Sequence, residues 1–498
     1  MKDVKKKRNE EKNVNIQSIE INSKLLLKIL LIITSIIFVI PSIKYIIDNG
    51  TIMNFNTYYD FTFNDLTDNK NISTIMYLIL LIISSVIYVL MIGKNKIFQN
   101  IKQLLIYVGV ISLIFMVMLP WTSSDIFYYM GVGEIDSVYH QNPYYVTIED
   151  VYNENNGNIQ DEILEKSVTN PWSSTTVVYG PMAQLLFKIT TKISFKNVDL
   201  CLFMFKIINV LLHILNCYLI YKITKKIKFS IIYGLNPLIF LEFIGNVHHD
   251  IVIVTFVLLA LYFLLKKKQI VPSVIFLSIA TGIKYYPILL LPIVILYYFK
   301  DEKKISRRII KCMKYGILFV VVLALQYLIY AKDFSILTAM LIQNSKYYKT
   351  IYAGLAFGFE KQMPVIEMRR LVLIIFVVAY IKFCFKLLFN KEQKFYKIIR
   401  KYNWLLILFI LSLSNFQQTY YIWLLPTIMW QKGDMIKCII GLTIASEIGN
   451  SIFMFYEEDS KYDLIFVLIT VLGTLILLLT NKKLIKNNKK LNNKQLQL

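Results

Sequence analysis

The stretch LPWTSSDIFYYMGVGEIDSVYHQNPYY at residues 119–145, continued by NPWSSTTVVYGPMAQLL at residues 170–186, is a polar interruption in a largely apolar chain. It follows an apolar run at residues 104–120, and residues 121–180 contain nine acidic residues and a single lysine. If the preceding run crosses a bilayer, Asp125 lies at the membrane surface, where a carboxylate is partly desolvated but still reaches water. Such a carboxylate suits a general base that acts on a polar substrate, and a solvated loop acid is the open alternative.

Composition indicates a membrane protein. The 498 residues are 56% hydrophobic, with a mean hydropathy of +0.54, and many apolar runs have the ~17–25 residues of a spanning helix. The net charge of +23 comes from lysines that cluster between these runs, as on a cytoplasmic membrane face, and no basic groove for nucleic acid is present. The five cysteines lie in or beside apolar runs without a CxxC pair, which excludes a disulfide framework or a zinc cluster.

The charge pattern predicts the orientation of the first helices. Residues 1–23 are basic and precede an apolar run at 24–47, which is too long for a signal-peptide core and is expected to stay as the first helix. Runs at 74–93 and 102–120 follow, with lysines between them. The positive-inside rule places the N-terminus and these lysines in the cytoplasm, so the acidic segment 121–195 is predicted to be a large extracytoplasmic loop carrying juxtamembrane helices.

The same reasoning extends to the rest of the chain. Residues 180–194 are predicted to form an amphipathic helix on the outer surface. Further crossings are expected at 198–221, 231–245, 251–265, 271–282, 288–299, 315–331, 371–388, 404–414, 420–430, 436–455 and 464–480. The prediction is an all-α polytopic membrane protein with about 14 helices (12–14) in one domain at 24–480. The prediction also includes a second extracytoplasmic loop at 332–370 and a cytoplasmic, Lys-rich tail at 481–498. Both termini are therefore predicted to be cytoplasmic.

Several short motifs in order carry a family resemblance. After SSDIFYYMGVGEI come NPYY, YGP, GNVHHDIVIV at 245–254, ATGIKYYPILLLP at 280–292 and FQQTYYIWLLP at 416–426. In these motifs and their order, the sequence resembles the GT-C class of membrane glycosyltransferases. It is most similar to the bacterial polyprenyl-phosphate-mannose-dependent mannosyltransferases. The resemblance implies transfer of mannose or another hexose from a polyprenyl-phosphate donor to a cell-envelope glycan or glycolipid. It further implies action on the outer face of a bacterial plasma membrane, with Asp125 deprotonating the acceptor hydroxyl.

Cations on the predicted outer face are candidates for binding the donor phosphate. Lys284 lies in ATGIKYYP, where it opposes the positive-inside bias, and snorkelling to the surface is the open alternative. The outer loop at 332–370 is also basic, although the other outer loops are acidic, and it could instead be a solvated loop. The donor candidates are Lys284, Lys346, Lys349, Arg369 and Arg370.

Polar and aromatic side chains at the predicted outer helix ends are candidates for binding sugar. They are Tyr128, Tyr129, Tyr179, Asn246, His248, His249, Asp250, Gln417, Gln418, Tyr420 and Trp423. No cofactor is identified, but a Mg²⁺ or Mn²⁺ ion held by His248, His249, Asp250 or Asp125 is left open. A polar cap at the start of the next helix, and a belt of interfacial aromatics, are the alternatives for these groups. Glu242 is a further functional candidate because it is an acid inside a predicted crossing.

Two other functions remain as alternatives. A lipid-linked oligosaccharide flippase or transporter would have ionisable residues throughout its helices, and a polysaccharide polymerase would have arginine-rich outer loops. Here the unusual residues gather at outer helix ends, which favours an enzyme. The sequence has no P-loop, GxGxxG or DxD nucleotide-sugar signature, which favours a lipid-linked donor. The expected partners are therefore that donor, a glycan acceptor and membrane lipids, and no nucleic acid.

Overall fold

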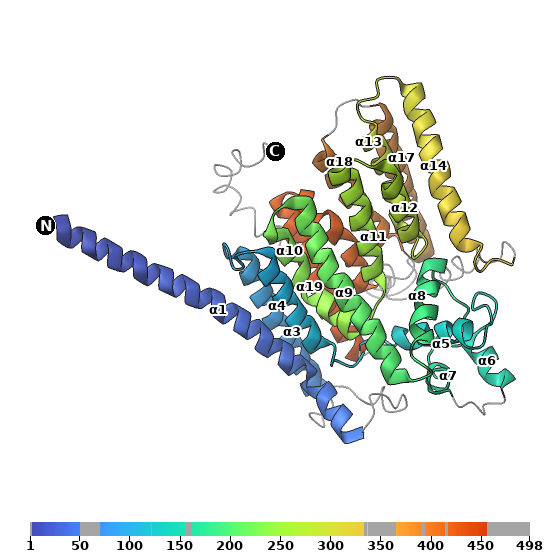
Figure 1. Cartoon of the computed structure of the whole chain (residues 1–498), viewed down its shortest axis with the longest axis horizontal. Helices are drawn as coiled ribbons and strands as arrows, with labels where there is room; N and C mark the ends of the chain where they lie inside the picture. The colour runs from blue at the N-terminus through green and yellow to red at the C-terminus, as the bar shows by residue number, and fades with distance from the viewer. Residues whose placement is uncertain are drawn as a thin grey trace.

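The computed structural model describes residues 2–49, 70–120, 122–155, 161–332, 336, 365–389, 394–413 and 417–455. These described residues form helices and contain no strand, as the sequence predicted. Figure 1 shows helices α9, α11, α12 and α14 running along one another, with α1 extending away from the bundle at one edge. The described part of the chain is all-helical and has the apolar helices of a membrane protein.

Hydropathy and exposure together identify the membrane-facing helices. Six helices of the described residues are long and apolar enough to cross a bilayer, or seven if one bent pair counts as one span. Large apolar side chains point outward from α14 and α17, including Ile317, Val320, Ile374 and Val378. Exposed aliphatic surface of this extent is costly in water but favourable against lipid. These spans do not confirm the predicted total of about 14 crossings. The last predicted crossing, at 464–480, lies outside the described residues.

The N-terminal helices follow the predicted runs with shifted ends. They are α1 (Lys2–Asn49), α3 (Lys70–Gly93) and α4 (Ile101–Phe115). Helix α1 begins well before the predicted run, and α4 ends five residues before Pro120. Asn100 caps the start of α4, where its side chain accepts from the Gln103 N–H. Beyond α4, buried Lys206 donates to the Met118 carbonyl and so satisfies a group that the helix has released.

The predicted outer loop folds into four short helices gathered at one end of the bundle (Figure 1). They are α5 (Asp125–Ser137), α6 (Ile148–Glu154), α7 (Glu162–Ser167) and α8 (Pro181–Lys192). Helix α8 is the amphipathic helix expected at 180–194, and its buried face packs mainly against α5. The next helix is α9 (Val198–Thr224), close to the predicted 198–221.

The crossing predicted at 231–245 is broken. It consists of α10 (Ile227–Gly234) and a π-helix, η2 (Ile239–Gly245), which are bent by 61°. Pro237 lacks the N–H that would continue the first helix, so the break follows from the sequence Asn236-Pro237. A break in an apolar environment frees backbone carbonyls that need donors.

Asn209 and His213, on a polar face of helix α9, supply partners for two of those carbonyls. Lys206, Asn209, His213 and Asn216 recur every three or four residues and are all buried. The Asn209 amide donates to Phe243 O at 2.6 Å, and the His213 ring lies 3.1 Å from Gly234 O. The polar stripe in this otherwise apolar helix therefore stabilises the broken helix beside it.

The remaining helices complete the bundle. They are α11 (Asp250–Tyr262), η3 (Phe263–Lys267), α12 (Ile270–Thr281), η4 (Tyr286–Leu290), α13 (Leu291–Tyr298), α14 (Ile305–Tyr327), α17 (Val365–Phe389), α18 (Phe395–Leu411), η6 (Gln418–Trp430) and α19 (Gly433–Phe455). Helix α14 begins ten residues before the predicted 315. Arg308 in its first turn donates to Leu387 O and Leu388 O, and these bonds stabilise the end of α17.

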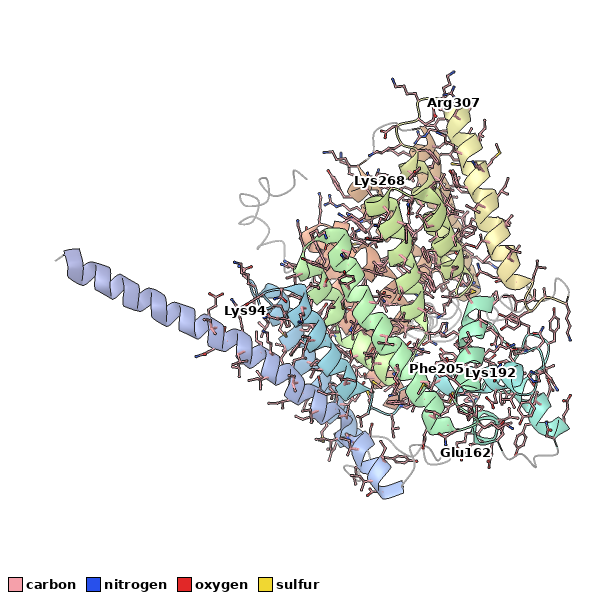
Figure 2. All side chains as sticks on the ribbon, in the orientation of Figure 1. Lys94, Glu162, Lys192, Phe205, Lys268 and Arg307 are labelled. Carbon is pink, nitrogen blue, oxygen red and sulfur yellow. The ribbon has the colours of Figure 1, made fainter. Side chains whose placement is uncertain are left out.

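Charged side chains lie at both ends of the bundle. In Figure 2, Lys268 and Arg307 lie at the upper end of the helices, whereas Glu162 and Lys192 lie with the short helices at the lower end. By the positive-inside rule the first end would be expected on the cytoplasmic side. The extracytoplasmic placement of the short helices stays a prediction.

Candidate active site

A cavity of about 280 Å³ opens between α5, the loop at 170–180, the loop before η4 and the start of η6. This volume is close to the lower end of the ~300–1,000 Å³ typical of small-molecule sites. Its lining is Asp125, Tyr128, Thr147, Trp172, Ser174, Thr175, Thr176, Val178, Tyr179, His248, Lys284, Gln417, Thr419 and Tyr420.

Asp125 is the first residue of α5 and faces this cavity. An acidic residue in the first helical turn is stabilised by the helix dipole, which explains why the helix begins there. The Tyr129 hydroxyl, one turn later, donates to Asp125 Oδ2 at 3.3 Å. The carboxylate is 26% exposed, so it combines a protein partner with access to a ligand.

A histidine joins Asp125 to a second carboxylate. His248 Nδ1 lies 3.6 Å from Asp125 Oδ2, and His248 Nε2 lies 3.1 Å from Glu242 Oε2. Glu242 is fully buried and also accepts from Gln418 Nε2 at 2.8 Å and Asn246 Nδ2 at 3.1 Å. Burial opposes protonation of His248, but the hydrogen bond and charge of Glu242, aided by Asp125, raise its pKa above the ordinary value. The arrangement favours an imidazolium between two carboxylates.

The broken helix places this histidine. Glu242 belongs to η2, and the chain then turns through Val247, whose φ of 64° is in the left-handed region. The Asn209 amide of α9 donates to His248 O at 3.1 Å and fixes the turn. A continuous helix through 231–265 would carry the histidine elsewhere, so the Asn-Pro break is needed to bring it to Asp125.

Lys284 forms the opposite side of the cavity. Its Nζ lies 3.0 and 2.8 Å from the two carboxylate oxygens of Asp250, the first residue of α11. Trp423 Nε1 donates to the same carboxylate at 2.9 Å. The ammonium also lies over the rings of Tyr420 and Tyr179, at 5.0 and 5.7 Å from their centroids. Snorkelling is therefore the wrong account of Lys284, because its charge points to a buried acid.

Two glycines allow the YGP and ATGIK motifs to meet. Gly180 N donates to Ile283 O at 3.1 Å, and Met182 N donates to Gly282 O at 2.9 Å. A Cβ on Gly180 would lie 2.2 Å from Gly282 O, which no side chain can tolerate. The close backbone approach holds Tyr179 beside Lys284.

His249 lies behind the cavity wall. Its ring packs edge-on against Tyr129, Tyr179 and Phe187 at centroid distances of 5.0, 4.5 and 5.5 Å. Within the described residues neither ring nitrogen has a hydrogen-bond partner. Burial, reinforced by the charge of Lys284, lowers the pKa of His249 to about 3, so the ring is neutral. This geometry suits packing beneath Tyr129 and Tyr179.

The predicted site residues divide into four groups. Those that line the cavity are Asp125, Tyr128, Tyr179, His248, Lys284, Gln417 and Tyr420. Those that support the lining from behind are Tyr129, Asn246, His249, Asp250, Gln418 and Trp423. Arg369 and Arg370 lie on α17 outside the lining, and Arg369 Nε donates to Ser412 O at 3.2 Å. Lys346 and Lys349 lie outside the described residues.

Part of the lining was missed from the sequence. Thr147, Trp172, Ser174, Thr176 and Thr419 were not named as site residues, although most belong to the motif stretches quoted above. The signal that could have found them is the cluster of hydroxyl side chains beside a tryptophan in NPWSSTT, between an acidic segment and YGP.

The ligand set for a divalent ion stays a prediction. In the described parts of the chain, no group of three or more His, Cys, Asp or Glu side chains is arranged to hold a metal ion. The carboxylate of Asp250 is engaged by Lys284 and Trp423 instead.

Comparison with known proteins gives the family. No curated protein matches the chain. The family described as Alpha-(1->6)-mannopyranosyltransferase, N-terminal domain, matches residues 49–300, which is half of the chain and includes α5, the loop at 170–180, His248 and Lys284. The resemblance to GT-C-type enzymes is thereby confirmed: the chain belongs to the alpha-(1->6)-mannopyranosyltransferase family of membrane mannosyltransferases.

Proposed function

We propose that this protein transfers a mannosyl residue from a polyprenyl-phosphate donor to a hydroxyl group of a cell-envelope glycan, on the extracytoplasmic face, with Asp125 as the general base. One observation carries the choice of base. Three acids lie around the cavity, and the side chains of Glu242 and Asp250 are only 0% and 1% exposed, whereas Asp125 is 26% exposed and lines the cavity. A general base must reach the proton that it removes.

The proposed reaction is a direct displacement. The acceptor oxygen forms a bond to the anomeric carbon of mannose while the bond from that carbon to the phosphate oxygen breaks. The acceptor proton passes to Asp125, and the electron pair leaves with polyprenyl phosphate. Direct displacement inverts the anomeric centre, so the alpha linkage in the family description requires a beta-linked donor.

His248 and Glu242 position the base in this proposal. His248 Nδ1 lies 3.6 Å from Asp125 Oδ2, and Glu242 holds the other ring nitrogen of His248 at 3.1 Å, so the imidazole orients the base. Such preorganised charge requires no rearrangement during the reaction.

Lys284 is the proposed contact for the donor phosphate. Its ammonium has three N–H groups and lines the cavity between two tyrosines, where a departing phosphate gains a cation. The lipid nature of the donor is supported by the membrane-embedded fold and by the lack of a nucleotide-sugar motif in the sequence.

The test is a transfer assay with detergent-purified protein. Radiolabelled polyprenyl-phosphate mannose is expected to label an octyl mannoside acceptor, and Asp125→Asn is expected to lower the rate by ~10²–10⁴-fold while donor still binds. Excess Mg²⁺ or Mn²⁺ is expected not to restore that rate, because a missing base differs from a weakened metal ligand. Near-normal transfer by Asp125→Asn would eliminate it as the base, and label transfer from a nucleotide sugar instead would refute the donor class.

A further inference from the structure

We propose that a basic hollow between α13 and α14 binds the headgroup of an anionic glycerophospholipid, and that an acyl chain of this lipid lies along α14. The hollow is at the end of the bundle where Figure 2 labels Arg307, away from the short helices α5–α8. It uses charged and apolar side chains that the candidate active site does not use. The inference therefore does not depend on the proposed reaction.

The hollow lies where the chain passes from α13 to α14 and has a volume of about 530 Å³. Four basic side chains, two acidic side chains and two aromatic rings line it. The lining residues are Tyr298, Phe299, Asp301, Glu302, Lys303, Lys304, Arg307 and Lys311. The lining thus has more positive than negative side chains, and a concave surface with such an excess attracts anions.

Internal contacts fix the wall of the hollow and engage only one of its cations. Lys311 Nζ lies 3.0 Å from Glu302 Oε2, and the other carboxylate oxygen of Glu302 accepts from the Lys304 N–H at 3.2 Å. Among the described residues, the side chains of Lys303, Lys304 and Arg307 form no ion pair, and all three are exposed. Three cations therefore remain to contact a phosphate, which accepts charge-assisted hydrogen bonds from such groups.

An exposed apolar stripe on α14 begins beside the hollow. It consists of aliphatic residues that follow Arg307 at intervals of three, seven, four and four residues, namely Ile310, Ile317, Val321 and Leu325. Residues at these intervals lie on one face of a helix. The helical rise places Val321 ~17 Å from Ile310 along the axis, close to the ~15 Å of one leaflet. An acyl chain of a lipid whose phosphate occupies the hollow would run along this stripe.

A neighbouring arginine fixes the rotation of α14. Arg308 is buried and donates to Leu387 O and Leu388 O of α17. Successive residues of a helix point ~100° apart, so Arg307 is directed away from the contact that Arg308 makes. The two adjacent arginines therefore have different surroundings: Arg308 joins two helices, and Arg307 is available to a ligand.

The apolar stripe favours a lipid over a soluble phosphate compound. A soluble phosphate would use the cations alone, whereas a phospholipid uses the cations and the adjoining aliphatic face. The position at a helix end also places the cations at the depth of the headgroups. A zwitterionic headgroup carries its own ammonium beside the phosphate, so it gains less from three further cations than an anionic headgroup does.

The test is equilibrium binding of fluorescent phosphatidylglycerol to the full-length protein purified in an uncharged detergent. Saturable binding is expected, and phosphatidylcholine is expected to compete at least about 10-fold less well than unlabelled phosphatidylglycerol. Inorganic phosphate in large molar excess is expected not to displace the lipid. Equal competition by phosphatidylcholine would overturn the preference for an anionic lipid, and displacement by inorganic phosphate would overturn the lipid as the ligand.

The triple variant Lys303→Gln/Lys304→Gln/Arg307→Gln tests the location of the site. It is expected to raise the Kd for phosphatidylglycerol by about 10- to 100-fold, because three cations at the membrane surface are lost. The three side chains are exposed, so the variant is expected to keep the Tm of the wild type. An unchanged Kd would overturn the hollow as the binding site.

The matched control removes the same number of charges elsewhere. Lys225, Lys226 and Lys228 are exposed lysines at the junction of α9 and α10, and they do not line the hollow. Replacing all three with glutamine is expected to change the Kd by less than about 2-fold, because screening weakens the effect of exposed charges outside the site. A loss of affinity equal to that of the first triple variant would mean that the lipid responds to the net charge of the protein, and the site would be refuted.

Discussion

Glu242→Gln tests whether the buried carboxylate acts through His248. The substitution keeps the shape of the side chain and an oxygen that can accept from Gln418 or Asn246. It removes the negative charge 3.1 Å from His248 Nε2. Glu242 is not part of the cavity lining, so a change in activity must pass through its neighbours.

The expected magnitude follows from the lost contact. A buried ion pair at 3.1 Å has about the strength of a hydrogen bond to a charged group, about 1.5–3 kcal/mol, so its loss is expected to slow transfer by about 10- to 150-fold. The pKa of His248 is raised by Glu242, so it falls in the variant and the imidazolium is lost at a lower pH. The alkaline limb of kcat/KM against pH is therefore expected to move to lower pH.

The assay is kcat/KM for mannosyl transfer measured across pH in detergent. Glu447→Gln is the matched control, because Glu447 is an equally buried acid on α19 that does not line the cavity. If Glu242→Gln folds and keeps both the rate and the pH profile of the wild type, the positioning role is refuted. A slower enzyme with an unmoved alkaline limb would also refute it, since a purely structural defect lowers the rate without moving a pKa.

Three further predictions concern other contacts. Lys284→Met alone would leave the buried Asp250 carboxylate without its cation and could destabilise the fold. The double variant Lys284→Met/Asp250→Asn removes both charges, and its donor KM is expected to rise about 10-fold or more. Burial and the adjacent Asp161 raise the pKa of Glu134 to about 8, so the folded protein binds the proton more tightly than the unfolded chain. Thermal stability is therefore expected to fall as pH rises from about 4.5 to 8, by up to about 5 kcal/mol, and Glu134→Gln is expected to flatten this dependence and raise Tm at pH 8. A cysteine at exposed Glu149 is expected to react with an impermeant thiol reagent in intact cells, whereas labelling only after lysis would contradict an extracytoplasmic loop.

Much of the fold could be predicted because the bilayer imposes one-dimensional rules on the sequence. A run of apolar residues long enough to span becomes a helix, and residues 198–221 were placed to within three residues of α9. The bend between α10 and η2 was not predicted: Asn236-Pro237 marks where the helix breaks, but the partners that satisfy the freed carbonyls are Asn209 and His213 of α9. Those partners are distant in sequence, and hydropathy does not report them.

The candidate site was predicted in part for a similar reason. Motif resemblance brought together Asp125, His248 and Lys284, which do line one cavity. It did not separate lining residues from those behind them, since His248 and His249 are adjacent in sequence and point to different surroundings. Trp172 was not predicted as a site residue because a loop sequence has no periodicity from which its position could be inferred. Its position depends on Asn170, which accepts from the Trp172 N–H and donates to Ser124 O directly before α5.

The pairing of charges explains why an acid remains available in the cavity. The two buried carboxylates behind the cavity are each paired with a cation of the lining, Glu242 with His248 and Asp250 with Lys284. Buried charges without such partners would be too costly in this environment. Asp125 is the acid left on the lining, held near His248 at 3.6 Å, a distance longer than a hydrogen bond. The two buried acids thus fix the two cations in place, and Asp125 keeps oxygen lone pairs free to receive a proton.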